Sequence, residues 1–253
     1  MKQSFSWWAF HKKPLTAEEV VREAARIGYA GVDLVPEEYW PVVRDGGLTI
    51  ACVGGHGTLS DGMNKRENHD RIRAEVTARL EKAVHFGIPT LVVFSGNHVD
   101  GQSDEEGLDN TVAVLQKLAP EAEQAGVTLA MELLNSKRDH AGYQCDRTAW
   151  GVRVCEAVGS PRVKLLYDIY HMQIMEGDVI ATIREHGAAH FSHYHTAGVP
   201  GRRDLDETQE LYYPAICRAI QETGFDGFLG HEFLPKGDVL AALEAAYKTC
   251  NVE

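Results

Sequence analysis

The chain has 253 residues, of which 44% are hydrophobic and 25% charged, and its formal net charge is −12 at pH 7. A chain of this length and apolar content can bury a large core, which excludes a disordered chain, a coiled coil and a disulfide-stapled miniprotein. The acidic charge argues against nucleic acid and anionic membrane surfaces as partners, and no run of about 18 apolar residues predicts a membrane span.

The N-terminal segment lacks the apolar middle and small-residue cleavage site of a signal peptide. The five cysteines are odd in number and include no Cys-x-x-Cys pair, which predicts reduced thiols rather than disulfides. We therefore expect a cytoplasmic protein that acts on a small molecule. The sequence leaves the formation of a homo-oligomer open.

Short runs of β-forming residues alternate with amphipathic helical stretches along the chain. The predicted strands cover residues 4–10, 31–35, 48–53, 90–94, 127–133, 163–167, 189–194 and 227–233. The predicted helices cover residues 17–27, 37–44, 71–86, 108–125, 147–158, 178–186, 213–222 and 238–247. Thr16 and Glu19 form a capping box before the first helix, and glycines such as Gly187 are predicted to end the later ones.

Eight strand–helix units of similar length predict a parallel sheet, and one (β/α)₈ TIM barrel over residues 1–253 as a single domain accounts for all of them. A doubly wound open sheet is the structural alternative. That fold normally carries a glycine-rich turn after its first strand, whereas this chain has Phe10-His11-Lys12-Lys13-Pro14 there. The sequence therefore favours the barrel.

Four predicted strands end in ionisable residues, spaced about one strand–helix unit apart: Glu132, Asp168, His195 and Glu232. The carboxyl ends of barrel strands meet at one face, so these side chains are expected to converge. Each residue alone is more often a helix cap, a loop salt bridge or a packed core residue. Three converging carboxylates repel one another unless a cation neutralises them. The set therefore predicts one divalent metal ion, with Mg²⁺ or Mn²⁺ preferred over Co²⁺ or Zn²⁺.

Four motifs around these residues carry a family resemblance. They are LYDIYHMQ at residues 166–173, HYHTAGVPGR at residues 193–202 and GHEF at residues 230–233, with ELLN at residues 132–135 in addition. Over nearly its whole length the chain resembles the hydroxypyruvate isomerase family. That family belongs to the xylose isomerase-like TIM-barrel superfamily of sugar isomerases and epimerases.

The resemblance implies that Glu132, Asp168, His195 and Glu232 bind the metal. It also implies that Glu132 and Glu232 exchange protons with the substrate, and that His171 and Arg202 hold substrate oxygens. His195 is a departure, because well-known bacterial hydroxypyruvate isomerases carry glutamine at this position and the epimerase branch carries histidine. The substrate therefore stays open between hydroxypyruvate, a ketose and another hydroxy-carbonyl compound.

Other polar and aromatic residues lie near the same face by the strand-end argument. His56 follows the third strand and Asn97 the fourth, and both are expected to bind substrate. Trp7 is expected to cover the sugar carbons together with Trp8, Phe10 and Tyr167, the alternative being that these aromatics form barrel core. His193 and His231 are interpreted as packing or supporting residues, although His193 could exchange roles with His195.

These residues predict a metal-dependent isomerase or epimerase of a small hydroxy-carbonyl compound or sugar. The cation stabilises an ene-diolate while Glu232 removes a proton and Glu132 acts as its partner. The enzyme alternatives are a lyase or dehydratase and an endonuclease-type phosphodiesterase, all built on the same metal site. The non-enzyme alternative is a sugar-binding barrel without turnover.

Overall fold

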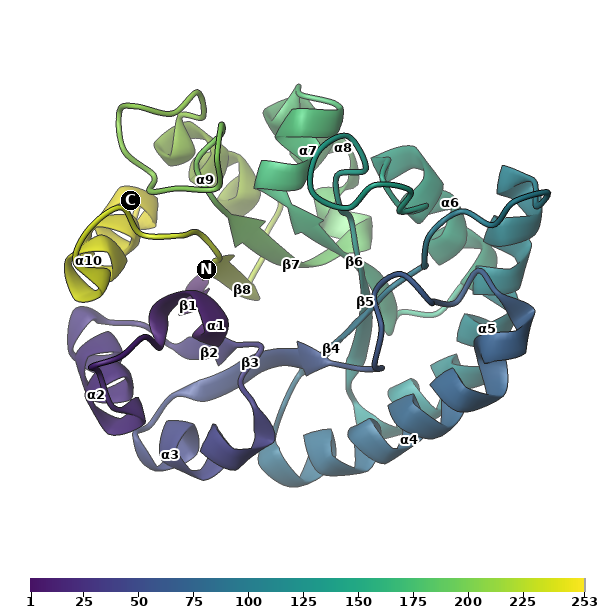
Figure 1. The fold of residues 1–253 in the computed structure, drawn as a ribbon, viewed down its shortest axis with the longest axis horizontal. Helices are drawn as coiled ribbons and strands as arrows, with labels where there is room; N and C mark the ends of the chain where they lie inside the picture. Colours follow the sequence, from purple (N-terminus) through teal and green to yellow (C-terminus); the bar gives the residue numbers. More distant parts are fainter. Residues whose placement is uncertain (253) are drawn as a thin grey trace.

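The structure, a computed structural model, describes residues 1–252 and is built around eight parallel strands in the order β1-β8-β7-β6-β5-β4-β3-β2. The strands are β1 (Lys2–Phe5), β2 (Gly31–Asp33), β3 (Thr49–Gly54), β4 (Thr90–Val93), β5 (Thr128–Glu132), β6 (Val163–Asp168), β7 (Phe191–Thr196) and β8 (Phe228–His231). They curl into a nearly closed barrel with helices outside it (Figure 1). The predicted TIM barrel is confirmed.

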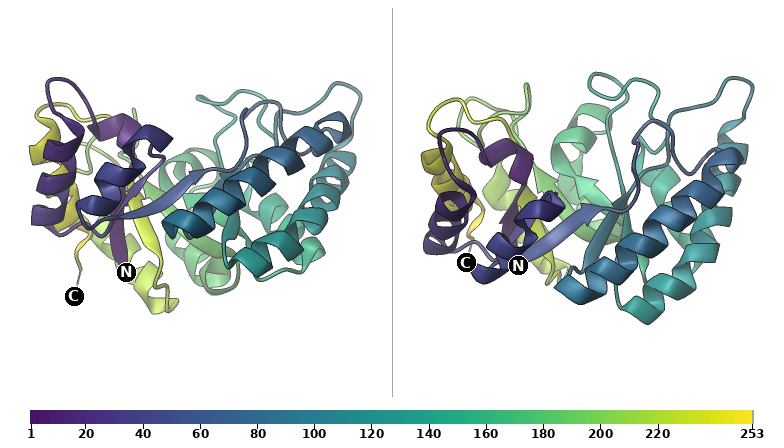
Figure 2. Two further views of the ribbon diagram at one scale, coloured as in Figure 1. Left: turned by 90° about the horizontal axis from the view of Figure 1, so that it is seen from below. Right: turned by 60° about the horizontal axis from the view of Figure 1, so that its bottom comes forward.

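The helices lie around the strands, and Figure 2 shows this ring from the side. They are α1 (Trp7–Phe10), α2 (Ala17–Ile27), α3 (Trp40–Asp45), α4 (His69–Phe86), α5 (Asp104–Ala125), α6 (Thr148–Val158), α7 (Ile169–Met175), α8 (Val179–His190), α9 (Tyr213–Glu222) and α10 (Val239–Cys250), with 3₁₀ turns η1 (Glu37–Tyr39) and η2 (Arg66–Asn68). Within residues 1–252, no helix has the length and apolar character needed to cross a membrane.

The barrel closes between its first two strands, where pairing is sparse. The backbone N–H of Ala30 donates to Gln3 O at 2.9 Å, and a single parallel bridge joins Ser6 to Asp33. The register between β2 and β3 shifts between Val32 and Asp33, as in a bulge, and such irregularities often re-aim a side chain. Asp33 therefore sits at the closing seam of the barrel.

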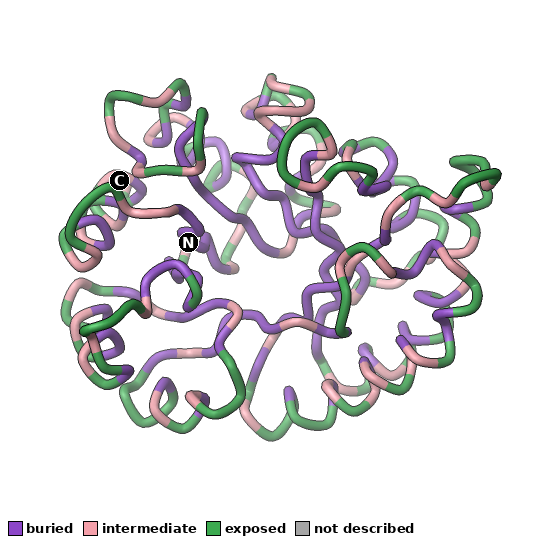
Figure 3. The backbone as a smooth tube through the Cα atoms, in the orientation of Figure 1, coloured by how far each residue is buried: buried purple, intermediate pink, exposed green. Residues whose placement is uncertain are grey.

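The buried residues form two layers. A large apolar cluster fills the space between the strands and the helices, and in Figure 3 the strands and the inner faces of the helices are coloured as buried. A small second cluster fills the barrel interior with Cys52, Val92, Ala130 and Leu166. Strand alternation carries the same inward face two residues onward, from Ala130 to Glu132 and from Leu166 to Asp168. The apolar floor of the barrel therefore lies directly beneath the ionisable strand ends.

Two local predictions were wrong. The predicted strand over residues 4–10 stops at Phe5, and Trp7–Phe10 forms a helical turn because Ser6 makes the last backbone bond to β8, its N–H donating to His231 O at 2.9 Å. Gly187 does not end its helix, which runs on to His190. A Cβ at Gly187 would lie 3.0 Å from the Tyr194 hydroxyl, so this glycine allows α8 to pack closely on β7. The Thr16–Glu19 capping box is present as predicted.

Candidate active site

The four predicted strand-end residues converge at one end of the barrel. Glu132 ends β5, Asp168 ends β6, His195 lies in β7 and Glu232 follows β8, and all four are buried. Each offers one ligand atom, and these atoms all lie within 4.8 Å of one another. The register supports the arrangement, because Asp168 pairs directly with His195. The structure thus brings together four side chains that are far apart in sequence.

His195 is the centre of this group. Its Nδ1 lies 3.1 Å from Oε2 of Glu232 and 3.4 Å from Oε1 of Glu132, yet no aligned hydrogen bond to Nδ1 is found among residues 1–252. A buried imidazole nitrogen between two carboxylates is suited to metal ligation, since a cation can bind the ring lone pair and both carboxylates together.

Burial and nearby charges shift the pKa values of the two glutamates in opposite directions. Burial, helped by nearby Glu232 and Asp168, raises the pKa of Glu132. Burial would raise the pKa of Glu232 as well, but His195 and Arg202 outweigh it and hold the pKa of Glu232 well below its usual range. Burial also raises the pKa of Asp168. Three carboxylates in one dry site are short of positive charge, so the donor set fits a divalent cation.

Arg202 supplies a guanidinium to this cluster. Its Nη2 donates to Oε2 of Glu232 at 2.6 Å and lies 3.9 Å from Oδ2 of Asp168. The backbone of Arg202 has a left-handed φ of 56°, and the N–H of Leu234 donates to its carbonyl at 2.8 Å. The loop after β7 therefore holds Arg202 against Glu232, in an unusual backbone conformation of the kind that clusters at functional sites.

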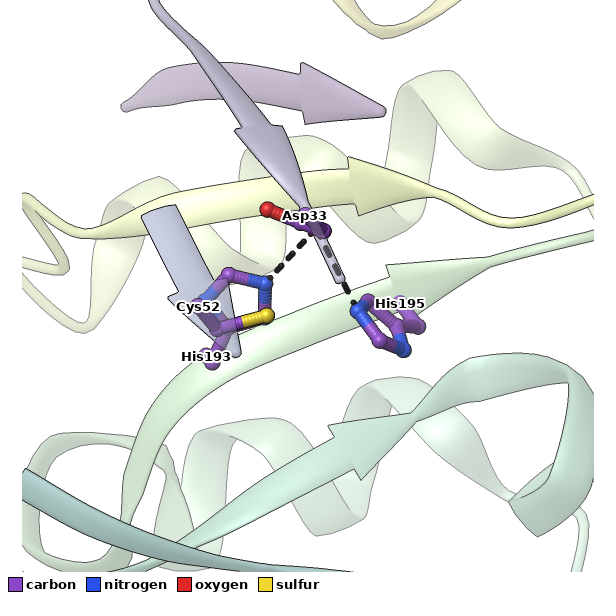
Figure 4. A group of neighbouring side chains, drawn as sticks. All are labelled: Asp33, Cys52, His193 and His195. Atoms are coloured by element: carbon purple, nitrogen blue, oxygen red, sulfur yellow. Dashed lines mark hydrogen bonds and ion pairs between the residues drawn. The ribbon is translucent and has the colours of Figure 1, made fainter. Parts of the chain in front are cut away.

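A second buried group supports His195 from the side opposite Glu232, and Figure 4 shows its members Asp33, Cys52 and His193 around His195. Oδ2 of Asp33 accepts hydrogen bonds from Nε2 of His193 at 3.0 Å and from the Ser4 hydroxyl at 3.0 Å, and lies 3.3 Å from Nε2 of His195. A carboxylate at the far nitrogen of a ligand histidine commonly fixes the ring and its tautomer.

Gly230 makes this approach possible. A Cβ on Gly230 would lie 2.0 Å from Oδ2 of Asp33 and 2.9 Å from Cδ2 of His195, so no other residue fits there without displacing them. Burial raises the pKa of Cys52, so its thiol stays protonated beside His195. Asp33 was not predicted from the sequence, although a carboxylate within the apolar run 31–35 is the same signal that identified Glu132. His193 has the supporting place expected of it.

His171 lies at the start of α7, next to Asp168. Its backbone N–H donates to Oδ1 of Asp168 at 3.0 Å, which caps the helix, and its Nε2 lies 3.6 Å from Oδ2 of the same residue. The ring is fully buried, and Nε2 has no hydrogen-bond partner among residues 1–252. This nitrogen is therefore available to a ligand.

The aromatic residues divide between site and core. Trp8 donates from Nε1 to Oε1 of Glu232 at 2.8 Å, and the Arg202 guanidinium lies 5.4 Å from the centre of its ring. Trp7 packs instead on Tyr39 and His11, with ring centres 4.9 and 4.4 Å away. The structure thus brings Trp8 to the cluster and shows Trp7 in aromatic packing. Tyr167 stacks on Phe191 in the outer core.

The other two predicted substrate-binding residues take part in loop structure. Nε2 of His56 accepts a hydrogen bond from the backbone N–H of Phe94 at 3.0 Å, and burial lowers the pKa of His56 to about 4. The Asn97 side chain donates to Ala141 O at 3.3 Å. No hydrogen bond or ion pair joins either side chain to the four-residue cluster within residues 1–252, so their contact with substrate stays a prediction.

A family model described as a xylose isomerase-like TIM barrel matches residues 21–249. The chain belongs to this family. Among curated relatives, 2-oxo-tetronate isomerase of Cupriavidus necator is 37% identical over 118 residues, which span 47% of this chain and 44% of that protein. A Homo sapiens protein named "Putative hydroxypyruvate isomerase" is 26% identical over 88% of this chain and 86% of its own length.

These relatives confirm the resemblance to the hydroxypyruvate isomerase family. Among solved structures, an AP endonuclease of family 2 from Brucella melitensis superposes with a TM-score of 0.83, at 24% identity over 96% of this chain and 97% of that chain. At this identity the superposition shows that this xylose isomerase-like barrel shares its fold with the Brucella protein.

Proposed function

We propose that the protein is a metal-dependent isomerase or epimerase of a small hydroxy-carbonyl compound or sugar. The observation that carries the proposal is the pair of buried glutamates that meet at one imidazole nitrogen, with Oε2 of Glu232 at 3.1 Å and Oε1 of Glu132 at 3.4 Å from Nδ1 of His195. The relatives, which are named as isomerases of 2-oxo-tetronate and hydroxypyruvate, support it.

Glu132, Asp168, His195 and Glu232 would hold the metal, since their ligand atoms lie within 4.8 Å of one another. When bound, a divalent cation supplies a Lewis acid that stabilises negative charge on the substrate oxygens. Asp33 would keep the His195 ring oriented, because its carboxylate lies at the other ring nitrogen. The best-supported ions remain Mg²⁺ or Mn²⁺, on the strength of three oxygen ligands.

The two glutamates would divide the proton transfer between them. Glu232 has a lowered pKa and is ionised, so it would take the proton from the carbon beside the carbonyl. Burial raises the pKa of Glu132 in the metal-free site, and as the second glutamate it would return a proton to the neighbouring carbon or to the opposite face. Environments that push two carboxyl pKa values apart commonly separate the base from the acid in this way.

Three neighbours would orient the substrate and Glu232. Arg202 and Trp8 donate to the two different oxygens of Glu232, which fixes the plane of its carboxylate. His171 would donate from Nε2 to a substrate oxygen. We further propose a small-molecule substrate rather than nucleic acid, in keeping with the charge of −12, and a cytoplasmic location remains a prediction.

The test is solvent deuterium exchange during single turnovers. Hydroxypyruvate, tartronate semialdehyde and a set of ketoses would be incubated with the protein in D₂O, with Mn²⁺ or Mg²⁺ added. An isomerase or epimerase incorporates deuterium at the carbon to which the proton is returned. Metal binding without exchange into any of these compounds would favour a sugar-binding barrel or a different chemistry.

A further inference from the structure

The turn that follows β5 is held by the side chain of Asn135. Its Oδ1 accepts hydrogen bonds from the backbone N–H groups of Arg138 at 3.0 Å and Asp139 at 2.9 Å. An amide NH₂ in that place would face two donors and make neither bond, so the backbone dictates which end of the amide is oxygen. The orientation of the Asn135 amide is therefore fixed, and it determines which atoms of the neighbouring side chains donate and which accept.

The amide nitrogen of Asn135 faces two further side chains. Nδ2 donates to Oδ2 of Asp139 at 2.8 Å and lies 2.6 Å from Nδ1 of His171. An amide nitrogen donates and does not accept, so Nδ1 of His171 must be the acceptor and carry no proton. Asp139 is itself anchored, because its Oδ2 also accepts from the Tyr170 hydroxyl at 2.8 Å. A neutral His171 therefore holds its single proton on Nε2.

That Nε2–H lies on the site side of the ring. It is 3.6 Å from Oδ2 of Asp168, in a side chain with no exposed surface, and no hydrogen-bond partner is found for it among residues 1–252. A buried N–H without an acceptor is costly, so a ligand that supplies an oxygen there recovers that cost.

We propose that Asn135 is a positioning residue that fixes His171 as a neutral hydrogen-bond donor, which bonds through Nε2–H to the substrate oxygen that gains negative charge as Glu232 removes the proton. A neutral ring supplies a donor without adding a positive charge beside the metal ligand Asp168. The use of this donor in catalysis rests on the proposed function, whereas the tautomer rests on the protein alone.

The tautomer can be measured directly in metal-free protein. Histidine side chains labelled with ¹⁵N would be observed by NMR at about pH 8, above the ordinary histidine pKa of about 6.5, and the His171 signal assigned by its loss in His171→Gln. We expect the proton on Nε2 in the wild type. In Asn135→Asp the carboxylate still accepts from both backbone N–H groups, but it also accepts from the ring, so the proton should move to Nδ1.

Two further variants serve as controls for this result. Lys137→Ala changes an exposed residue of the same turn and should leave the proton on Nε2. Asn135→Asp places two carboxylates together, so the double variant Asn135→Asp/Asp139→Asn restores a donor between the two positions and should show the same move to Nδ1. A wild-type proton on Nδ1, or no movement in either Asn135 variant, overturns the inference.

The catalytic use of the donor is tested by kinetics on a compound that exchanges deuterium with the wild type. Asn135→Asp should remove the Nε2–H donor of His171. Loss of one donor to a developing oxyanion typically lowers kcat by about 10²–10³, and KM should change little. If Asn135→Asp moves the proton and keeps the wild-type kcat, the catalytic part is overturned. If no compound exchanges with the wild type, the proposed function fails, while the NMR experiment still decides the tautomer.

Discussion

The two halves of the barrel mouth use polar strand-end residues in different ways. In the half made by β5–β8, one oxygen each of Glu132 and Glu232 lies at Nδ1 of His195, and no backbone N–H within residues 1–252 donates to these oxygens. In the half made by β1–β4, the Asp33 carboxylate accepts hydrogen bonds from Ser4 and His193, and Nε2 of His56 accepts one from the backbone N–H of Phe94. The β5–β8 half thus gathers carboxylate oxygens at an imidazole nitrogen that has no aligned hydrogen bond within residues 1–252, whereas the polar side chains of the β1–β4 half hold the barrel seam and a loop together.

The largest effect is expected in the β5–β8 half, from Glu132→Gln and Glu232→Gln. Each change keeps the shape and one acceptor oxygen but removes a group that transfers a proton, so turnover should fall by about 10²–10⁴. The measurement is kcat beside metal stoichiometry on the substrate found by deuterium exchange. Full activity in either variant would contradict the assigned roles.

Metal removal is expected to have the next largest effect. A ligand that binds only the folded state stabilises it by about 3–4 kcal/mol at 100–1,000 times its dissociation constant. Chelation of metal-loaded protein should therefore lower the melting temperature, and added Mn²⁺ should restore it. Glu232→Gln is the matched comparison and should lose most of this response. A metal-loaded wild type that melts unchanged after chelation would argue against the site.

In the β1–β4 half, the prediction concerns how His56 makes the free energy of unfolding depend on pH. Burial lowers its pKa to about 4 in the folded protein, whereas the unfolded chain binds a proton near pH 6.5. As pH falls below about 6.5 the unfolded state gains the proton first, so His56 should contribute a loss of about 2 kcal/mol between pH 7 and 5. Urea unfolding of metal-free protein would measure this loss. His56→Gln should reduce it, and equal losses in both proteins would show that His56 titrates normally.

The smallest effect is expected for Asp33→Asn. The carboxylate of Asp33, in the β1–β4 half, contacts His193 and His195 in the β5–β8 half. The amide cannot act as a carboxylate partner to His195, and loss of such partners typically weakens metal affinity about 10–100-fold. Competition of Mn²⁺ with a fluorescent chelator would measure the change. Gly237→Ala is a control because no atom lies within 4 Å of a Cβ built there. Unchanged affinity in Asp33→Asn would assign this carboxylate to barrel closure alone.

The sequence predicted the barrel and the four converging residues because both depend on spacing that repeats with each strand–helix unit. Asp33 escaped prediction since it ends a strand of only three residues, Gly31–Asp33, whose register shifts at that point. The sequence did not separate Trp8, which contacts Glu232, from Trp7, because a strand was expected where the chain makes a helical turn. These errors share one cause: the direction of a side chain depends on irregular backbone that alternation does not describe.

The position of Trp8 also has an optical consequence. The other tryptophans, Trp7, Trp40 and Trp150, are nearly inaccessible, whereas Trp8 is 37% exposed and shares its indole N–H with Glu232. A ligand that binds Oε1 of Glu232 changes the polarity around this indole. Fluorescence emission from this single partly wet tryptophan can therefore follow occupancy of the mouth in real time, without a label and before any substrate is identified.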